Sequence, residues 1–257
     1  MNRPSPREAV SDLLVMARRE LTATVRKPAL LVFAFIQPVI LILIFRYVFG
    51  GAIRTPNGSY VNYLMSGILV MTAVFGSLMT GIGLSEDLSK GIVDRLRSLP
   101  IARSAVLAGR TLSDLARNLV SVILMLAVGL LVGFSPSQSV LKVGAAIVLL
   151  LAFGYVFSWI AATIALLVRD PETAQGAGFV WVFPLVFLSS AFVPTHTMPA
   201  LVRALANVNP ITLCVDAVRA LTIGGNTTRP LLGTLAWLAG LLLVFVPFAV
   251  SRYRALE

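Results

Sequence analysis

The chain has 257 residues, of which 58% are hydrophobic and 12% charged, and its mean hydropathy is +0.91. Water-soluble domains carry about 25% charged residues, so a soluble fold could not bury this much apolar surface and lipid must surround most of it. The formal net charge of +10 would suggest nucleic acid as a partner of a soluble protein, but here the basic residues flank apolar stretches and indicate membrane topology, so no nucleic-acid partner is expected.

The first 28 residues are polar and basic, without the short apolar core and the small-residue cleavage site of a removable signal peptide. Apolar residues recur in them at helical spacing: Val10, Leu13, Leu14, Ala17, Leu21 and Val25. This pattern predicts an amphipathic interfacial helix on the inner leaflet, and a cytoplasmic helix packed on protein is the alternative. The first apolar stretch is expected to remain as an anchor.

Six apolar stretches of about 20 residues follow, the length that a hydrocarbon core about 30 Å thick requires. They are residues 29–49, 63–84, 112–134, 141–168, 174–192 and 231–250. Helices are expected because each satisfies its own backbone hydrogen bonds in lipid, whereas a β-barrel would show alternation. The predicted fold class is an all-α membrane protein with six transmembrane helices, forming a single domain over residues 1–257.

Local signals mark two of these stretches. Gln37 and Pro38 make a polar break in the middle of the first span, where the proline is expected to kink the helix and to act as a candidate gate. Before the fifth span, Asp170 can cap the helix, Pro171 suits the first helical position and Glu172 favours the positive helix end. Gly129 and Gly133 give a GxxxG spacing in the third span, which favours close helix packing.

The distribution of lysine and arginine predicts the orientation. Fourteen of them lie in the N-terminal segment, the loop 85–110, the turn at Arg169 and the C-terminus, whereas five lie in the segments on the other side. Cytoplasmic loops carry the excess of positive charge. Both termini are therefore expected in the cytoplasm, and the chain in the cytoplasmic membrane.

The loop 85–110 contains a second amphipathic pattern. On a helical projection one stripe holds the apolar residues Ile92, Val93, Leu96 and Leu99. The opposite face holds Asp94, Arg95, Arg97 and Ser98, and Pro100 stops the helix. The apolar stripe needs cover from the membrane or from a groove in a partner protein, and the mixed charges favour the protein partner.

The segment 193–230 is too polar and too rich in proline to span, yet apolar residues recur in it. It is expected to lie outside the membrane as two short helices broken at Asn209 and Pro210, dipping partway into the bilayer where protein covers the backbone.

Two stretches resemble a known family. GIVDRLRSLPIARSAVLAGR, residues 91–110, resembles the loop between the second and third spans of ABC-2 type permeases of the daunorubicin-resistance exporter family. MPALVRALANVNPITLCVDAVRAL, residues 198–221, is similar to that family's segment after the fifth span. The order of elements also agrees, so the resemblance covers nearly the whole chain, although these motifs do not specify a substrate.

The resemblance implies a dimeric pore driven by two cytosolic ATPase subunits, which bind ATP and Mg²⁺. The helix at residues 92–99 would be the coupling helix in the ATPase groove, and residues 1–28 the connecting helix. A second permease subunit, identical or different, would meet this one at spans one and five. Candidate contacts to the ATPase are Glu86, Asp87, Ile92, Asp94, Arg95, Leu96, Arg97 and Leu99.

Motifs that the sequence lacks exclude several classes of function. The three lysines are followed by Pro, Gly and Val, so the chain has no P-loop, no cofactor of its own is expected, and ATP must be used by another chain. Cys214 and His196 are the only residues of their kinds, which excludes an intrachain disulfide and a Cys/His metal site. The span centres carry almost no ionisable residues, which argues against an ion-driven carrier. Asp114 and Arg117, near the inner end of span three, are expected to pair.

Aromatic and methionine side chains are the candidates for a substrate path. Phe179, Phe183 and Phe187 repeat every four residues in span five, and Met71, Phe75 and Met79 do so in span two. They could line a path for a flat apolar drug or a lipid chain, or pack against lipid and neighbouring helices. The expected function is the permease of an ABC exporter for a hydrophobic or amphipathic compound. The alternatives are a polysaccharide or glycolipid exporter, an ion-driven carrier and a structural membrane protein.

Overall fold

The computed structural model describes residues 36, 38–49, 59–91, 103–168 and 170–254, and within these ranges the chain is helical without strands. The main helices are α3 (Tyr60–Ser89), α5 (Arg103–Leu131), α6 (Val140–Val168), α7 (Pro171–Phe187), α8 (Ala200–Val208), α9 (Pro210–Ile223) and α10 (Thr228–Arg254). A short apolar helix, Pro38–Val48, precedes them and ends in the π-helical turn η1 (Phe45–Phe49), and a 3₁₀ turn, η2 (Thr195–Thr197), precedes α8.

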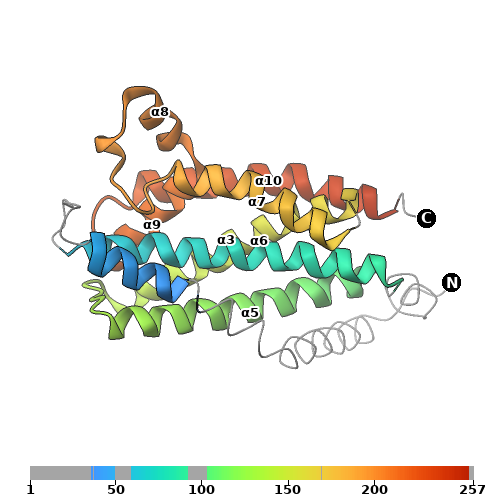
Figure 1. Cartoon of the computed structure of the whole chain (residues 1–257), viewed down its shortest axis with the longest axis horizontal. Coiled ribbons are helices and arrows are strands. Elements are labelled where there is room, and N and C mark those ends of the chain that lie inside the picture. The colour runs from blue at the N-terminus through green and yellow to red at the C-terminus, as the bar shows by residue number, and fades with distance from the viewer. Residues whose placement is uncertain (1–35, 37, 50–58, 92–102, 169, 255–257) are drawn as a thin grey trace.

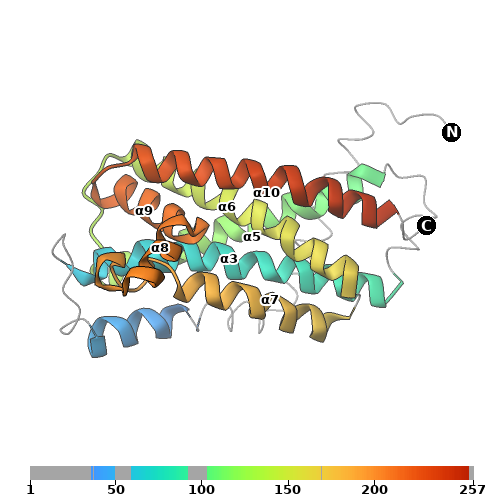
Figure 2. The same ribbon diagram turned by 90° about the horizontal axis from the view of Figure 1, so that it is seen from above.

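Figures 1 and 2 show α3, α5, α6, α7 and α10 lying side by side along one axis, with α3 in the middle of the bundle. Helix α9 lies at the end of the bundle where α3 begins, which we call the α9 end. The opposite end, where α3 finishes and α7 begins, is called the Ser89 end. Helix α3 is the most buried of the long helices, so the core forms around it.

Among the described residues, four helices are long and apolar enough to cross a membrane, namely α3, α5 from Ser113, α6 and α10. Helices α8 and α9 could form a fifth span, but they are bent by 72° at Asn209. The all-α membrane fold is therefore confirmed, whereas the number of six spans stays a prediction. Helix α7 has 17 residues, about 26 Å, and most of the predicted first span lies outside the described residues.

Several helix boundaries differ from the predicted spans. Helix α5 begins at Arg103, inside the predicted loop, and α7 ends at Phe187, five residues before the expected end of span five. After α7 the chain turns, because the segment that follows the helix is hydrogen-bonded to α3 and α9. One such bond runs from the Tyr60 hydroxyl to the Phe192 carbonyl at 3.2 Å. The predicted break of the outer segment into two helices at Asn209 is confirmed.

The predicted GxxxG spacing does not lie on one helix. Gly129 is in α5 and packs against Met65, but Gly133 follows the helix end with a φ of 99°, a conformation that favours glycine. The Phe134 amide donates back to the Gly129 carbonyl at 2.8 Å, which closes the helix end. The Arg46 guanidinium lies beside Gly133. Its positive charge there interacts favourably with the negative C-terminal end of the α5 dipole.

Glycines bring α3 into direct contact with neighbouring backbone. A Cβ added at Gly67 would overlap the Ala191 carbonyl oxygen and lie 2.8 Å from the Ala191 carbonyl carbon. A Cβ at Gly81 would lie 2.7 Å from the Ala161 carbonyl oxygen on α6. Small residues allow this approach in lipid, where helices associate through packing and hydrogen bonds.

The predicted cap of α7 is confirmed. The carboxylate of Asp170 accepts hydrogen bonds from the backbone amide of Thr173 at 2.8 Å and from its hydroxyl at 2.6 Å. These two hydrogen bonds lower the pKa of Asp170 below its usual value, and the bond from the hydroxyl has the larger effect. The cap therefore keeps its charge at neutral pH and weakens only as the pH falls through this lowered pKa.

Candidate functional site

The Ser89 end carries part of the predicted ATPase contact. Glu86 and Asp87 lie on the last turns of α3, and the Glu86 carboxylate pairs with the Lys90 ammonium at 3.1 Å. The other predicted contacts lie outside the described residues: Ile92, Asp94, Arg95, Leu96, Arg97 and Leu99. The segment that holds them joins the end of α3 to the start of α5, so these two helices would receive any force applied to it.

The proposed gate in the first span is only partly described. Pro38 is partly buried at the start of the apolar helix Pro38–Val48, and Gln37 lies outside the described residues. Its role as a kink or gate stays a prediction.

The predicted pair on α5 is confirmed and also reaches α3. The Arg117 guanidinium lies 2.8 Å from the Asp114 carboxylate, and its Nη2 donates to the Gly76 carbonyl at 3.2 Å. At the next residue of α5, the buried amide of Asn118 fits between Gly76 on α3 and Gly154 on α6. The Arg117 bond therefore joins α5 to α3, and Asn118 packs closely against both α3 and α6.

The phenylalanines predicted to share a face of α7 do so, and they form a row. Ring centroids are 5.5 Å apart between Phe179 and Phe183, and 5.8 Å apart between Phe183 and Phe187. The row also includes Phe75 of α3, whose ring lies 6.1 Å from Phe179 and 6.0 Å from Phe183. The structure therefore brings together four of the six residues predicted for the substrate path.

The two methionines of that prediction do not share one environment. Met71 lies in the buried core, whereas Met79 is 44% exposed. The two residues lie on one stripe of α3 but eight residues apart, so they have different neighbours along the length of the bundle.

Two further phenylalanines extend the row to the α9 end, and the sequence pattern missed both. Phe192 lies 5.7 Å from Phe187 and stacks on Phe45 of η1 at 4.7 Å. Phe192 lies beyond the end of α7, so helical spacing could not place it on the same face. The row is open on one side, since Phe183 is 41% and Phe187 60% exposed.

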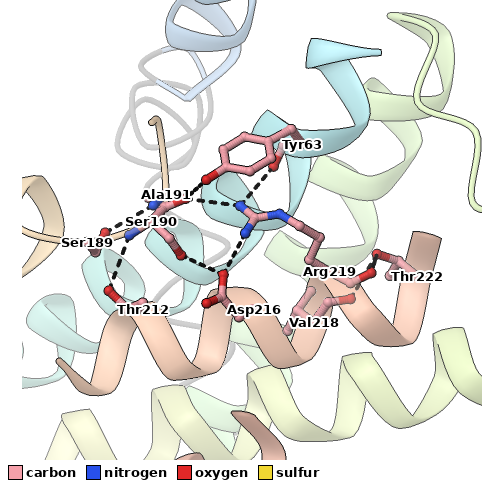
Figure 3. A network of polar contacts seen from close by, with 9 residues as sticks. All are labelled: Tyr63, Ser189, Ser190, Ala191, Thr212, Asp216, Val218, Arg219 and Thr222. Atoms are coloured by element: carbon pink, nitrogen blue, oxygen red, sulfur yellow. Dashed lines mark hydrogen bonds and ion pairs between the residues drawn. The ribbon is translucent and has the colours of Figure 1, made fainter. Parts of the chain in front are cut away.

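A buried arginine network at the α9 end was also missed. Arg219 of α9 is only 8% exposed, and its guanidinium lies 2.6 Å from the Asp216 carboxylate on the same helix (Figure 3). Its Nη2 donates to the carbonyls of Tyr63 at 3.3 Å and Ser190 at 3.0 Å. The guanidinium also lies 3.6 Å from the centroid of the Tyr63 ring, a close cation–π contact.

Ser190, just after α7, is the centre of this network. Its carbonyl also accepts from the Tyr63 hydroxyl at 2.9 Å, and its own hydroxyl donates to Asp216 at 2.7 Å. Its backbone amide donates to the Thr212 hydroxyl at 3.2 Å (Figure 3). The network thus joins α3, α9 and the end of α7, which are far apart in the sequence.

A spacing signal for this network was present in the sequence. Asp216 and Arg219 are three residues apart, the same spacing that predicted the pair on α5. In the charge distribution, Arg219 is one of the five basic residues on the other side, because the segment 193–230 is expected outside the membrane. Tyr63 and Ser190 could not be added without knowing the tertiary arrangement.

Residues 11–223 match the family described as ABC-2 type transporter, which is most of the chain. The chain belongs to that family. It is 34% identical over 252 residues to the daunorubicin resistance ABC transporter permease protein DrrB1 of Streptomyces coeruleorubidus, covering 98% of this chain and 89% of the relative. It is 27% identical over 248 residues to the Mycobacterium tuberculosis protein named Probable doxorubicin resistance ABC transporter permease protein DrrC, covering 96% and 90%.

This ABC-2 permease is accordingly a multi-pass membrane protein and the membrane component of an ABC exporter, whose family works with an ABC ATPase. The resemblance seen in residues 91–110 and 198–221 is confirmed at the level of the family.

Proposed function

We propose that this ABC-2 permease exports a hydrophobic or amphipathic compound through a pore of two permease subunits, driven by two cytosolic ATPase subunits. The observation that carries the proposal is the similarity, along nearly the whole chain, to a permease named for daunorubicin resistance. The second relative is named for doxorubicin resistance. A drug or a lipid is therefore the proposed class of cargo.

We place both termini and the Ser89 end in the cytoplasm, and the α9 end outside. The excess of lysine and arginine in the segments that connect to the Ser89 end supports this orientation. In this arrangement residues 92–99 form the coupling helix and dock in a groove of the ATPase. The ATPase binds ATP and Mg²⁺, since this sequence lacks a P-loop.

Docking of the coupling helix is tested by the substitution Leu96→Asp. Leu96 lies on the apolar stripe predicted to face the ATPase, so a carboxylate there would lose its solvation on docking. We expect the wild-type chain to copurify with an ATPase subunit in about equal amounts, and L96D to lose the partner and export. The measurements are subunit ratio, membrane insertion and export from cells.

The matched control is Ser98→Asp, which adds the same charge to the polar face of the same predicted helix. It should keep the partner and export normally. Normal export by L96D would show that this loop does not couple the two subunits. Uphill transport by the purified chain without an ATPase would overturn the exporter proposal as a whole.

The phenylalanine row is proposed as one wall of the path for cargo. An aromatic contact is worth about 0.5–1.5 kcal/mol, so removing one ring should weaken cargo binding by about two- to tenfold. Phe183→Ala is expected to raise the half-saturating concentration of a flat aromatic cargo by this factor, with little change in ATPase assembly. Transport into inverted membrane vesicles measures it.

Val180→Ala is the control for this variant, because Val180 lies on the same helix, is 75% exposed and is outside the row. It should leave the half-saturating concentration unchanged. If both substitutions had the same effect, or neither had any, the row would be a packing surface and not a cargo path.

A further inference from the structure

Arg46 has no ion pair and no hydrogen bond within the described part of the chain, although its side chain is partly buried. Its guanidinium lies at the end of α5, with Nη1 3.2 Å from the position that a Cβ on Gly133 would take. It also lies 5.2 Å from the centroid of the neighbouring Tyr47 ring. The five N–H groups of the guanidinium are therefore without an oxygen acceptor among the described residues.

The negative end of α5 offsets only part of the charge on Arg46. A helix end carries about half an elementary charge, whereas a guanidinium carries a full one. A partly buried cation also loses hydration, and this costs free energy when no other group replaces the water. An anion is therefore expected beside Arg46, supplied either by an acidic side chain or from outside the chain.

No described acidic side chain is placed to supply it. Six of the eleven acidic residues are described, and five of these lie at the Ser89 end or on the half of α5 nearest to it: Glu86, Asp87, Asp114, Asp170 and Glu172. The sixth, Asp216, lies at the α9 end, where it already binds Arg219 at 2.6 Å and Ser190 at 2.7 Å. The acids outside the described residues belong to the N-terminal segment, the loop 85–110 and the C-terminus, which are expected on the side of the Ser89 end.

The surface around Arg46 is apolar and exposed. Figures 1 and 2 show its helix, Pro38–Val48, in blue at the α9 end of the bundle. On this helix Tyr47 is 72% and Val48 67% exposed, and Leu131 at the end of α5 is 89% exposed. Apolar side chains on the outside of a membrane protein meet acyl chains, and tyrosine is enriched where acyl chains meet headgroups. The nearest anion for Arg46 is therefore a lipid headgroup.

We propose that Arg46 binds the phosphate of an anionic phospholipid in the leaflet at the α9 end, with the acyl chains against Val48 and Leu131. A planar guanidinium can donate to two phosphate oxygens at once. An anionic headgroup is favoured over a zwitterionic one, because the α9 end already carries unpaired basic side chains such as Arg229, and a choline group would add a further cation.

A second copy of the chain is a poorer partner for Arg46 than a lipid. Copies that associate with two-fold symmetry present the same surface to each other. The partner would therefore bring a second Arg46 to the interface, and its Asp216 would be bound to its own Arg219. The charge on Arg46 would increase locally and would not be neutralised.

The lipid composition next to Arg46 tests the proposal in the full chain. A bimane fluorophore is attached at Leu131→Cys, with buried Cys214 replaced by alanine. The chain is reconstituted in vesicles of equal parts phosphatidylglycerol and phosphatidylcholine, and one lipid or the other carries brominated acyl chains, which quench the fluorophore on contact. Leu243→Cys on α10, where Leu243 is 77% exposed, is the control position for lipid contact away from Arg46.

We expect phosphatidylglycerol to quench the label at Leu131→Cys at least twofold more than phosphatidylcholine does, and the two lipids to quench equally at Leu243→Cys. Arg46→Gln should abolish the difference at Leu131→Cys. Arg229→Gln removes another arginine of the α9 end and should keep the difference. Normal quenching at Leu243→Cys in the Arg46→Gln chain would show that this variant is inserted in the membrane like the wild type.

Equal quenching by the two lipids at Leu131→Cys in the wild-type chain, or a preference that survives Arg46→Gln, would overturn the proposal. Protection of Leu131→Cys from both lipids would overturn it as well, because protein would then cover this surface. A preference that is lost on adding inorganic phosphate, but not chloride at the same ionic strength, would show that the site takes a free anion and not a lipid. These outcomes are independent of the role of residues 92–99 in ATPase coupling.

Discussion

Arg219→Gln is expected to destabilise the folded bundle by about 3 kcal/mol and to abolish export. The substitution leaves the Asp216 carboxylate without its cation, and the carbonyls of Tyr63 and Ser190 lose the donor they share. The effect falls at the lower end of the range for a broken buried pair, because Asp216 is partly exposed. Thermal unfolding in detergent and export from cells measure it.

Two comparison variants separate the network from a general loss of charge. Arg229→Gln removes an exposed arginine at the start of α10 and should leave both measurements unchanged. Asp216→Asn in the Arg219→Gln background removes the uncompensated charge and should recover part of the lost stability. If Arg219→Gln were as stable as Arg229→Gln, the network would not hold α9 to α3 and to the end of α7.

Gly67→Ala is expected to destabilise the bundle by about 3 kcal/mol, the upper end of the usual cost of overpacking. The added methyl would overlap the Ala191 carbonyl oxygen and lie 2.8 Å from the Ala191 carbonyl carbon. These are backbone atoms, held in place by the bonds around Ser190 and Phe192, so they cannot move aside as a flexible side chain would. The unfolding temperature in detergent should fall accordingly.

Gly240→Ala on α10 is the matched control, since nothing lies within 4 Å of its added Cβ. It should be neutral or slightly stabilising, because alanine favours a helix more than glycine does. Equal unfolding temperatures for the two variants would mean that the turn after α7, at Ala191, does not lie against α3 as described.

The fold was largely predictable because lipid imposes simple requirements on a sequence. Long apolar runs must be helices, and local signals such as Asp170 before Pro171 set a helix start through bonds between near neighbours. The pair of Asp114 and Arg117 followed from helical spacing in the same way. Features that depend on one helix alone could therefore be predicted from the sequence.

Features that depend on how distant segments meet were not predictable. Helix α7 ends at Phe187 because the Tyr60 and Tyr63 hydroxyls form hydrogen bonds to the turn beyond it. No local sequence pattern predicts these bonds. The same turn places Phe192 in the aromatic row and Ser190 against Arg219. The burial of Met71 and the exposure of Met79 likewise depend on which helices pack against each part of α3.

The bond between Arg117 and Gly76 has a mechanical consequence for α3 and α5. Sliding one helix along the other by a single residue, about 1.5 Å, would stretch the 3.2 Å contact beyond hydrogen-bonding distance, while the Asp114 pair on α5 would move with the arginine. Axial slip between the two is thus resisted, whereas a joint tilt leaves the contact intact. A push on the segment that links them would rock the pair as a single rod.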